Sequence, residues 1–247
     1  MNFIKQKFKE YGIPFEEKIS LKEKTWIKTG GIASLWIEPT SVEMLRNTIE
    51  ILHSAKIDFE LVGHTSNLYY LDVYNPNVIL STIKVKQFKE NENSIECACG
   101  TPVTTISRYC VEKGYTGYSG LVNLPGTVGA AICNNSSCFD CSVSEHLIES
   151  TFYDLDKNEI VNLRPQDFHF TYRSSKLKRK EMRGVLLTLK LDKQHGYINE
   201  EKAKAAEATR IRKFTQEPPA YTLGSVFAGL IPKRNILGLL ALGGVNF

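Results

Sequence analysis

The segment that most restricts how this chain can fold lies near its middle, at residues 125–129, with the sequence PGTVG. Proline fixes φ and has no N–H group, whereas glycine allows a backbone to approach a ligand closely. The small apolar residues that follow, Ala130, Ala131 and Ile132, predict the start of a helix. Backbone N–H groups at a helix start favour an anionic ligand group. Such short glycine motifs also occur in ordinary loops, so a turn without a ligand is the alternative.

A second glycine turn follows a short predicted strand. Residues 33–38 read as a strand closed by Pro39, Ser41 is a good N-cap for a helix to about residue 55, and residues 59–62 form another strand. That strand runs directly into the polar turn at residues 63–67, and α/β folds place ligands at such turns. His64 in this turn is a candidate base, but nothing near it in the sequence would orient its ring, so an exposed loop histidine is the alternative.

The remaining elements mix helix and strand without an internal repeat. Helices are predicted at residues 2–11, 103–113 and 199–213. Strand-like segments are predicted at residues 25–28, 78–80, 83–88, 94–98, 146–155, 160–163 and 184–191. This mixed order indicates an α+β fold, with boundaries near residues 83–89 and 194–197.

Composition excludes several classes of protein. With 247 residues, 42% hydrophobic and 23% charged, the chain is long enough for one large or two small globular domains. A net charge of +4 suits a phosphate-bearing small ligand but is too slight to indicate nucleic acid. No stretch reaches the roughly 18–20 apolar residues of a membrane span, and the charged N-terminus has no apolar core of a signal peptide. We therefore expect a cytoplasmic protein without a membrane partner.

Six cysteines raise the question of a metal centre. Without an export signal, we expect reduced thiols. Cys133, Cys138 and Cys141 have the spacing C-x4-C-x2-C, which coincides with part of a plant-type iron–sulfur pattern. That pattern expects its fourth cysteine downstream, whereas the other three cysteines of this chain lie upstream. Structural cysteines are therefore favoured over an iron–sulfur protein, and no metal site is assigned.

Five motifs occur in an order that resembles the family of UDP-N-acetylenolpyruvoylglucosamine reductases, the flavin enzymes of peptidoglycan precursor synthesis. They span residues 25–228, about four-fifths of the chain. The motifs are TGG at residues 29–31 with Ala33, GHTSN at 63–67, PGTVG at 125–129 with Asn134, FTYRSS at 170–175, and Gln216 followed by GSVF at 224–227. The short link at residues 191–210 resembles the compact variant of the family.

The resemblance implies a fold of the vanillyl-alcohol-oxidase type. It implies two FAD-binding subdomains, at residues 1–85 and 86–192, and a shortened substrate-binding subdomain at residues 193–247. Glycines and nests of backbone donors suit the FAD pyrophosphate. The implied cofactor-binding residues are Gly63, His64, Thr65, Ser66, Asn67, Leu124, Pro125, Gly126, Thr127, Gly129, Ala130 and Asn134.

The resemblance also implies a reaction. NADPH reduces the flavin, which then passes hydride to the enolpyruvyl double bond of UDP-N-acetylglucosamine enolpyruvate. The carboxylate would be polarised by Arg173 and the carbanion protonated by Ser225, because these residues match the catalytic positions of the motifs. The partner would be a UDP-sugar, the protein a monomer, and its role cell-wall synthesis, and with it cell shape and division.

The chain departs from the family pattern at several places. Thr65 replaces a glycine, residues 136–140 (SSCFD) replace Gly-Ala-Tyr-Gly, and residues 228–230 replace a Lys-Asn-Pro type segment. No acidic residue follows Glu217, so the assisting glutamate of the family has no counterpart in this sequence. These departures predict, as the alternative, a flavin- or UDP-sugar-binding relative with weakened or no reductase activity.

Overall fold

The computed structural model describes residues 2–216 together with residues 222 and 223. The smaller of its two main sheets has the strand order β1-β2-β4-β3. Its strands are β1 Phe15–Ser20, β2 Ile32–Ile37, β3 Glu60–Val62 and β4 Val78–Ser81. β1 is antiparallel to β2, whereas β4 runs parallel to both β2 and β3. Parallel strands end at the same edge of a sheet, so the turn after β3 lies at that edge.

The larger sheet is antiparallel throughout, in the order β10-β9-β11-β6-β5. Its strands are β5 Phe88–Glu90, β6 Ser94–Ala98, β9 Leu147–Asp154, β10 Glu159–Leu163 and β11 Gly184–Asp192. A separate two-stranded hairpin consists of β7 Ser137–Cys138 and β8 Cys141–Ser142.

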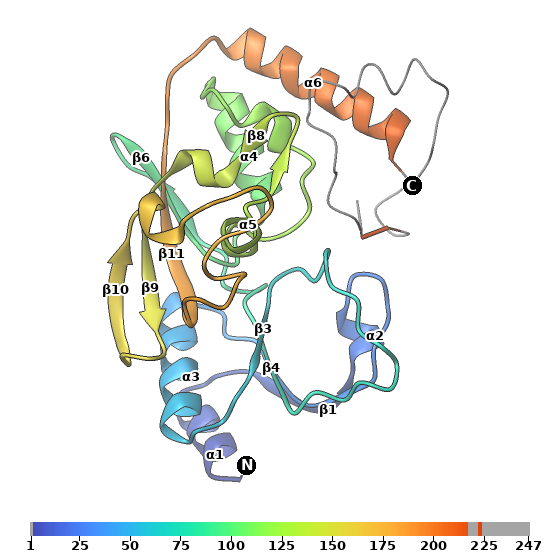
Figure 1. Ribbon diagram of the computed structural model, residues 1–247, viewed down its shortest axis with the longest axis vertical. Helices are drawn as coiled ribbons and strands as arrows, with labels where there is room; N and C mark the ends of the chain where they lie inside the picture. The colour runs from blue at the N-terminus through green and yellow to red at the C-terminus, as the bar shows by residue number, and fades with distance from the viewer. Residues whose placement is uncertain (1, 217–221, 224–247) are drawn as a thin grey trace.

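Helices cover the sheets and the end of the molecule (Figure 1). The α-helices are α1 Asn2–Glu10, α2 Leu21–Lys24, α3 Val42–Ser54, α4 Val103–Lys113, α5 Val128–Asn134 and α6 Ile198–Thr215. Three short 3-10 helices are η1 Ser119–Leu121, η2 Val143–His146 and η3 Pro165–Phe168. Helix α6 lies across α4 and η1 at one end of the molecule, which is the top of the view (Figure 1). None of the helices described is long and apolar enough to cross a bilayer.

One buried cluster joins the two sheets. It includes Phe8 of α1, Leu45 and Ile49 of α3, Leu35 of β2 and Leu189 of β11, each with no exposed surface. Helix α3 therefore packs against both sheets and holds the turn after β3 at a set distance from the larger sheet. The predicted boundary at residues 85/86 falls between β4 and β5, and the subdomain limits remain a prediction.

The α+β class is confirmed, but two strand predictions are wrong. Residues 25–28 form a turn, because the Thr25 hydroxyl bonds both the N–H and the carbonyl O of Thr29, at 3.1 and 2.9 Å. Such local side-chain bonds compete with strand pairing. Residues 83–87 also form a turn, in which the Val85 N–H donates to the Thr82 carbonyl and the Val85 side chain is fully buried. Strand β1 was not predicted, because its sequence FEEKIS is too charged to read as a strand.

The partly buried carboxylate of Glu90 connects β5 to α4 and to the segment that leads to α6. Glu90 accepts hydrogen bonds from the hydroxyls of Tyr109 and Tyr115 and from the Lys193 ammonium at 2.6 Å. The Lys193 bond, followed by the two tyrosine bonds, lowers the pKa of Glu90 from an ordinary 4.5 to about 2. The folded state thus favours the ionised carboxylate.

Replacing Glu90 by glutamine is expected to lower the free energy of unfolding at pH 7 by about 1–2 kcal/mol, since three donors lose a charged acceptor that is partly screened by solvent. Because the folded pKa lies below the unfolded one, the stabilisation is complete above about pH 5 and is lost as pH falls from 4.5 toward 2. Urea unfolding at pH 7, 5 and 3 measures this. A difference between wild type and Glu90→Gln that does not shrink at pH 3 contradicts it.

Candidate functional site

Two glycine-containing turns, one from each half of the described chain, touch each other. The turn at residues 63–67 follows β3, and residues 125–127 precede α5. A Cβ atom built on Gly63 would lie 2.6 Å from Thr127 Oγ1 and 3.5 Å from the Cβ of Ala130. Contacts below 3.0 Å are not tolerated. Only glycine therefore lets the backbone at residue 63 pack against the side chain of Thr127. The sequence could not show that Gly63 faces another turn of the same chain.

The two glycines of PGTVG have physical roles that differ from that of Gly63. Gly126 has a φ of +123°, a backbone conformation that residues other than glycine rarely adopt. Gly129 packs the first turn of α5 directly onto the end of β6: its N–H donates to the Cys99 carbonyl at 2.9 Å, and an added Cβ would lie 2.9 Å from Cys99 Cβ. Thr127 is the N-cap of α5, with its hydroxyl accepting from the Ala130 N–H at 3.4 Å.

The two turns present backbone donors that the rest of the described chain does not use. Within residues 2–216, 222 and 223, the N–H groups of residues 64–67, Gly126 and Thr127 donate to no protein group. Unpaired backbone N–H groups are costly when dry and are satisfied by water or a ligand. Successive backbone donors of this kind form nests that bind anions, phosphates in particular. The touching turns therefore offer an anion-binding surface made of main chain.

A cavity of about 480 Å³ opens on one side of the touching turns. Eleven of the twelve cofactor-binding residues predicted from the sequence line it: Gly63, His64, Thr65, Ser66, Asn67, Pro125, Gly126, Thr127, Gly129, Ala130 and Asn134. Leu124 does not line it and is half-buried beside Pro125. The sequence missed the opposite wall, which consists of Leu177, Lys180, Met182, Gly184 and Leu186. No motif marks these residues: Gly184 and Leu186 reach the cavity through the pairing of β11 with β9, and the other three lie in the segment that precedes β11.

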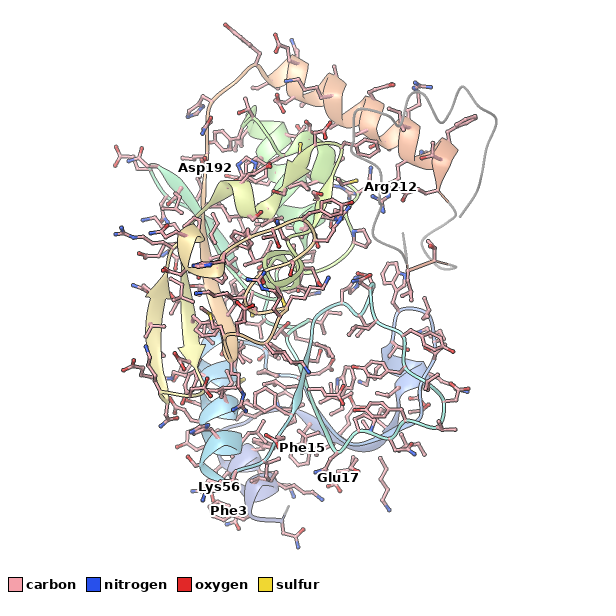
Figure 2. All side chains as sticks on the ribbon, in the orientation of Figure 1. Phe3, Phe15, Glu17, Lys56, Asp192 and Arg212 are labelled. Atoms are coloured by element: carbon pink, nitrogen blue, oxygen red, sulfur yellow. The ribbon has the colours of Figure 1, made fainter. Side chains whose placement is uncertain are left out.

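A second cavity of about 590 Å³ lies on the other side of the same turns and shares His64, Ser66, Pro125 and Gly126 with the first. Its described lining carries three cationic side chains and no carboxylate. These are Arg108 of α4 and Arg212 and Lys213 of α6. Arg212 extends from α6 into the molecule (Figure 2). The remaining lining includes Trp26, Asn123, Gln216, Thr222 and Leu223.

His64 separates the two cavities and is half-buried rather than an exposed loop residue. Its ring packs against the Trp26 ring with centroids 4.7 Å apart. Burial, followed by the charge of Lys86, lowers the pKa of His64, so the ring is neutral near pH 7. The position suits packing against a ligand, and the role of His64 as a base remains untested.

Thr65 keeps the backbone conformation of the glycine that the family pattern has at this place. Its φ is 52°, in the left-handed region, where a β-branched residue is strained. The side chain is buried, and its hydroxyl accepts the Trp26 N–H at 2.8 Å. This bond offsets part of the strain and ties the turn to the segment after α2, so the substitution leaves the shape of the turn intact.

Arg173 lies in a tight turn that is attached to the C-terminal end of α5. Asn135 Nδ2 donates to the Thr171 carbonyl at 2.7 Å, Ser175 Oγ to the Cys133 carbonyl at 2.6 Å, and Lys178 Nζ to the Arg173 carbonyl at 2.9 Å. The Arg173 guanidinium lies over the ring of Tyr172, 5.8 Å from its centroid. These bonds explain why the FTYRSS motif and the segment after α5 belong to one structural unit.

Of the two predicted catalytic residues, Arg173 and Ser225, only Arg173 is among the described residues. Arg173 lines neither cavity, although its charge reaches Cys138, which Arg212 of the second cavity also contacts. Ser225 lies outside the described residues, as do most of residues 193–247 that the sequence assigns to a substrate-binding subdomain. The nearest described residues before Ser225 are Thr222 and Leu223, which line the second cavity.

The cysteines of the C-x4-C-x2-C spacing are half-buried free thiols around α5 and the β7–β8 hairpin. Within the described part of the chain, no group of three or more histidine, cysteine, aspartate or glutamate side chains is arranged to hold a metal ion. Cys97, Cys99 and Cys110 are buried in the core on β6 and α4.

Comparison with known proteins adds names to this arrangement. Residues 33–164 match a family described as FAD binding domain. The UDP-N-acetylenolpyruvoylglucosamine reductase of Caldicellulosiruptor saccharolyticus is 31% identical over 92% of this chain and 73% of its own length. The crystal structure of UDP-N-acetylenolpyruvylglucosamine reductase (MurB) from Thermus caldophilus has a TM-score of 0.67 and 20% identity, and the match covers 84% of this chain and 71% of that one. Physcomitrella patens BBE-like 1 has a TM-score of 0.54 and 15% identity over 77% of this chain and 44% of its own.

Proposed function

The chain belongs to the UDP-N-acetylenolpyruvoylglucosamine reductase family, and on this premise we propose that it reduces the enolpyruvyl group of a UDP-sugar with hydride taken from NADPH. It is an FAD-dependent oxidoreductase of peptidoglycan precursor synthesis, with NADPH as reductant. The observation that carries the proposal is the first cavity, which gathers eleven predicted cofactor-binding residues at the contact of two glycine turns.

The residues present fit FAD. A dinucleotide has two bulky ends joined by a doubly charged pyrophosphate, and the touching turns offer unpaired N–H groups with a cavity on either side. Gly126 leaves no side chain where main chain would meet the pyrophosphate, and Gly63 lets the two turns pack against each other. The bound flavin supplies the hydride-transfer chemistry. We infer that residues 64–67, Gly126 and Thr127 hold the pyrophosphate and that the two ends occupy the two cavities.

The second cavity is the better candidate for the reacting end. Its cations Arg108, Arg212 and Lys213 suit the phosphate groups of NADPH and of the UDP-sugar. Leu223 lines it, two residues before Ser225 in the chain. In this proposal Arg173 holds the substrate carboxylate through its bidentate fork and stabilises the charge that develops on it, and Ser225 donates a proton to the adjacent carbon.

The finer assignments rest on the same family. We propose FAD-binding subdomains at residues 1–85 and 86–192, a substrate-binding subdomain from residue 193, and a monomeric cytoplasmic enzyme whose product serves cell shape and division. The separation of the two sheets at residues 82–87 supports the first boundary. The end of β11 at Asp192 supports the second.

The direct test starts from the purified full chain. We expect flavin absorption near ~375 and ~450 nm, bleaching by NADPH without oxygen, and reoxidation on addition of the enolpyruvyl sugar. A protein that is bleached by NADPH but not reoxidised by the sugar would sink the reductase proposal and favour a flavin-binding relative without this activity. A protein that binds the UDP-sugar but no flavin would refute the cofactor assignment as well.

A further inference from the structure

Two of the cysteines that the proposed function does not use face each other across a tight hairpin. Cys138 and Cys141 are register partners in the antiparallel β7–β8 pair. The two residues between them, Phe139 and Asp140, have φ of 46° and 61°, as in a two-residue type I′ turn. Opposed residues of an antiparallel pair have Cα atoms about 4.5–5.5 Å apart, which lies within the roughly 4.4–6.8 Å of disulfides. The backbone therefore already has the geometry that a bridge between these thiols requires.

Two cations act on the sulfur of Cys138. Arg212 Nη1 of α6 lies 3.5 Å from Cys138 Sγ, and Arg173 also acts on it electrostatically. Burial raises the pKa of the Cys138 thiol, and the charges of Arg212 and then Arg173 oppose that rise. Cations beside a cysteine stabilise the thiolate, which is the nucleophile in disulfide exchange.

The surroundings of Cys141 are of the opposite kind. Burial raises the pKa of its thiol, a hydrogen bond with the Gly120 backbone opposes that rise, and the carboxylates of Glu145, Glu201 and Asp140 add to it. Glu201 is a buried carboxylate of α6 with 1% of its surface exposed. Its Oε1 accepts from Lys204 Nζ at 2.7 Å, whereas its Oε2 has no hydrogen-bond partner within the described chain. Helix α6, which carries Glu201, packs on η1, and Gly120 of η1 lies against Cys141 Sγ. A buried, unpaired carboxylate oxygen in this region is a candidate acceptor for the proton of that thiol.

We propose that Cys138 and Cys141 form a reversible redox couple, with Cys138 as the attacking thiol and Glu201 as the proton acceptor for Cys141. The Cys138 thiolate attacks a low-molecular-weight disulfide such as oxidised glutathione and releases one glutathione thiolate. Cys141 then gives its proton to Glu201 and attacks Cys138 Sγ, which expels the second glutathione. Two protein thiols lose two electrons, and one glutathione disulfide becomes two thiols.

The couple lies close enough to the second cavity for its oxidation to change a residue that lines the cavity. Gly120 packs against the hairpin so closely that an added Cβ would lie 2.5 Å from the Cys138 carbonyl and 2.9 Å from Cys141 Sγ. The hairpin backbone is thus held in place, and bridge formation moves the sulfurs rather than the strands. The Arg212 guanidinium contacts Cys138, and Arg212 also lines the second cavity. Oxidation would replace the thiol that this guanidinium contacts by a disulfide sulfur.

The test uses the purified full chain with its flavin, reduced first and then equilibrated with oxidised glutathione in the absence of NADPH. After acid quenching and alkylation, the protein is cut before Asp140, which separates the two cysteines onto different fragments. We expect the two fragments to stay joined until they are reduced, with a loss of about 2 Da for the two hydrogens removed. Full alkylation of both Cys138 and Cys141 at equilibrium overturns the proposal.

Serine variants identify the partners and the attacking thiol. Cys133→Ser is the matched control from the same segment and should keep the bridge, so loss of the bridge in this variant overturns the pairing. Cys141→Ser should accumulate a glutathione adduct on Cys138, whereas Cys138→Ser should acquire one on Cys141 at least about tenfold more slowly. The reverse order overturns Cys138 as the attacking thiol. A zinc ion bound by the reduced protein, seen in native mass spectra, would replace the redox interpretation with a metal site.

Replacing Glu201 by glutamine tests the proton acceptor. We expect closure of the bridge to slow by about tenfold or more, so that the mixed disulfide accumulates. Glu207→Gln on the same helix is the control, because Glu207 is exposed and pairs with Arg210. The alkylation rate of Cys133 should be unchanged in both variants and shows that the fold is intact. Equal closure rates in Glu201→Gln and wild type contradict the role of Glu201.

Discussion

Replacing Arg173 by alanine is expected to slow reoxidation of the reduced flavin by the enolpyruvyl sugar by ~10²–10³-fold, while reduction by NADPH keeps its wild-type rate. Loss of one preorganised charge that stabilises the developing anion costs about 2.7–4 kcal/mol. Bonds from Asn135 and Ser175 tie the Arg173 turn to the end of α5, a bond from Lys178 holds the turn itself, and none of them uses the guanidinium. The fold should therefore survive the change. Anaerobic stopped-flow absorbance of the two half-reactions measures the effect.

Matched variants separate charge from structure in this experiment. Arg183→Ala removes a guanidinium of the same segment that pairs with Asp156 at the surface, and it should leave both half-reactions unchanged. Arg173→Lys keeps the charge but loses the bidentate fork, so a partial loss is expected. Ser225→Ala should also slow only the sugar step, as its proposed proton is used only there. Equal slowing of both half-reactions by Arg173→Ala would show that Arg173 serves the fold rather than the substrate.

Much of the fold could be predicted from the sequence where local signals agree with the tertiary structure. The Ser41 cap and the Gly114 end of α4 lie where the sequence indicates them, with Ser41 Oγ accepting the Met44 N–H at 3.1 Å and Gly114 at φ 75°. One of the two strand errors comes from a local side-chain bond and the other from a contact with the core. Residues 25–28 alternate like a strand, but the Thr25 side chain closes a turn. Val85 enters the core from a turn rather than from a strand.

The candidate site was predictable on one wall only. The turn at residues 63–67 and the PGTVG segment carry glycines that are visible as motifs, although at Gly63 and Gly129 the need for glycine comes from contacts with other parts of the chain. The opposite wall includes Met182 and Leu186, which are ordinary apolar residues; sheet pairing places Leu186 there, and Met182 lies just before the same strand. In the sequence, Glu201 is indistinguishable from the other charged residues of its helix. Only the packing of α6 on η1 shows that it is buried.

Replacing Gly63 by alanine is expected to remove most of the bound flavin, with at least a tenfold rise in the dissociation constant, about 1.4 kcal/mol. The added methyl carbon would lie 2.6 Å from Thr127 Oγ1 and 3.3 Å from Thr127 Cγ2, so one turn must move away from the other. That movement separates the unpaired N–H groups of residues 64–67 from those of Gly126 and Thr127, which we propose bind one pyrophosphate together. Flavin content after purification and FAD titration of the apoprotein by fluorescence quenching measure the loss.

A double variant tests whether the contact itself is responsible. Thr127→Ala removes both side-chain atoms that the new methyl group would meet, at the cost of a weak α5 cap with a 3.4 Å bond. Gly63→Ala combined with Thr127→Ala should therefore bind FAD more tightly than Gly63→Ala alone, a coupling that a double-mutant cycle isolates. Gly12→Ala is the control for backbone strain elsewhere: its φ of +63° disfavours alanine, but the methyl group would meet nothing within 4 Å, so FAD binding should not change. Additive losses from the two changes would contradict a clash between the turns as the cause, and would leave loss of a direct ligand contact at Gly63 as the explanation.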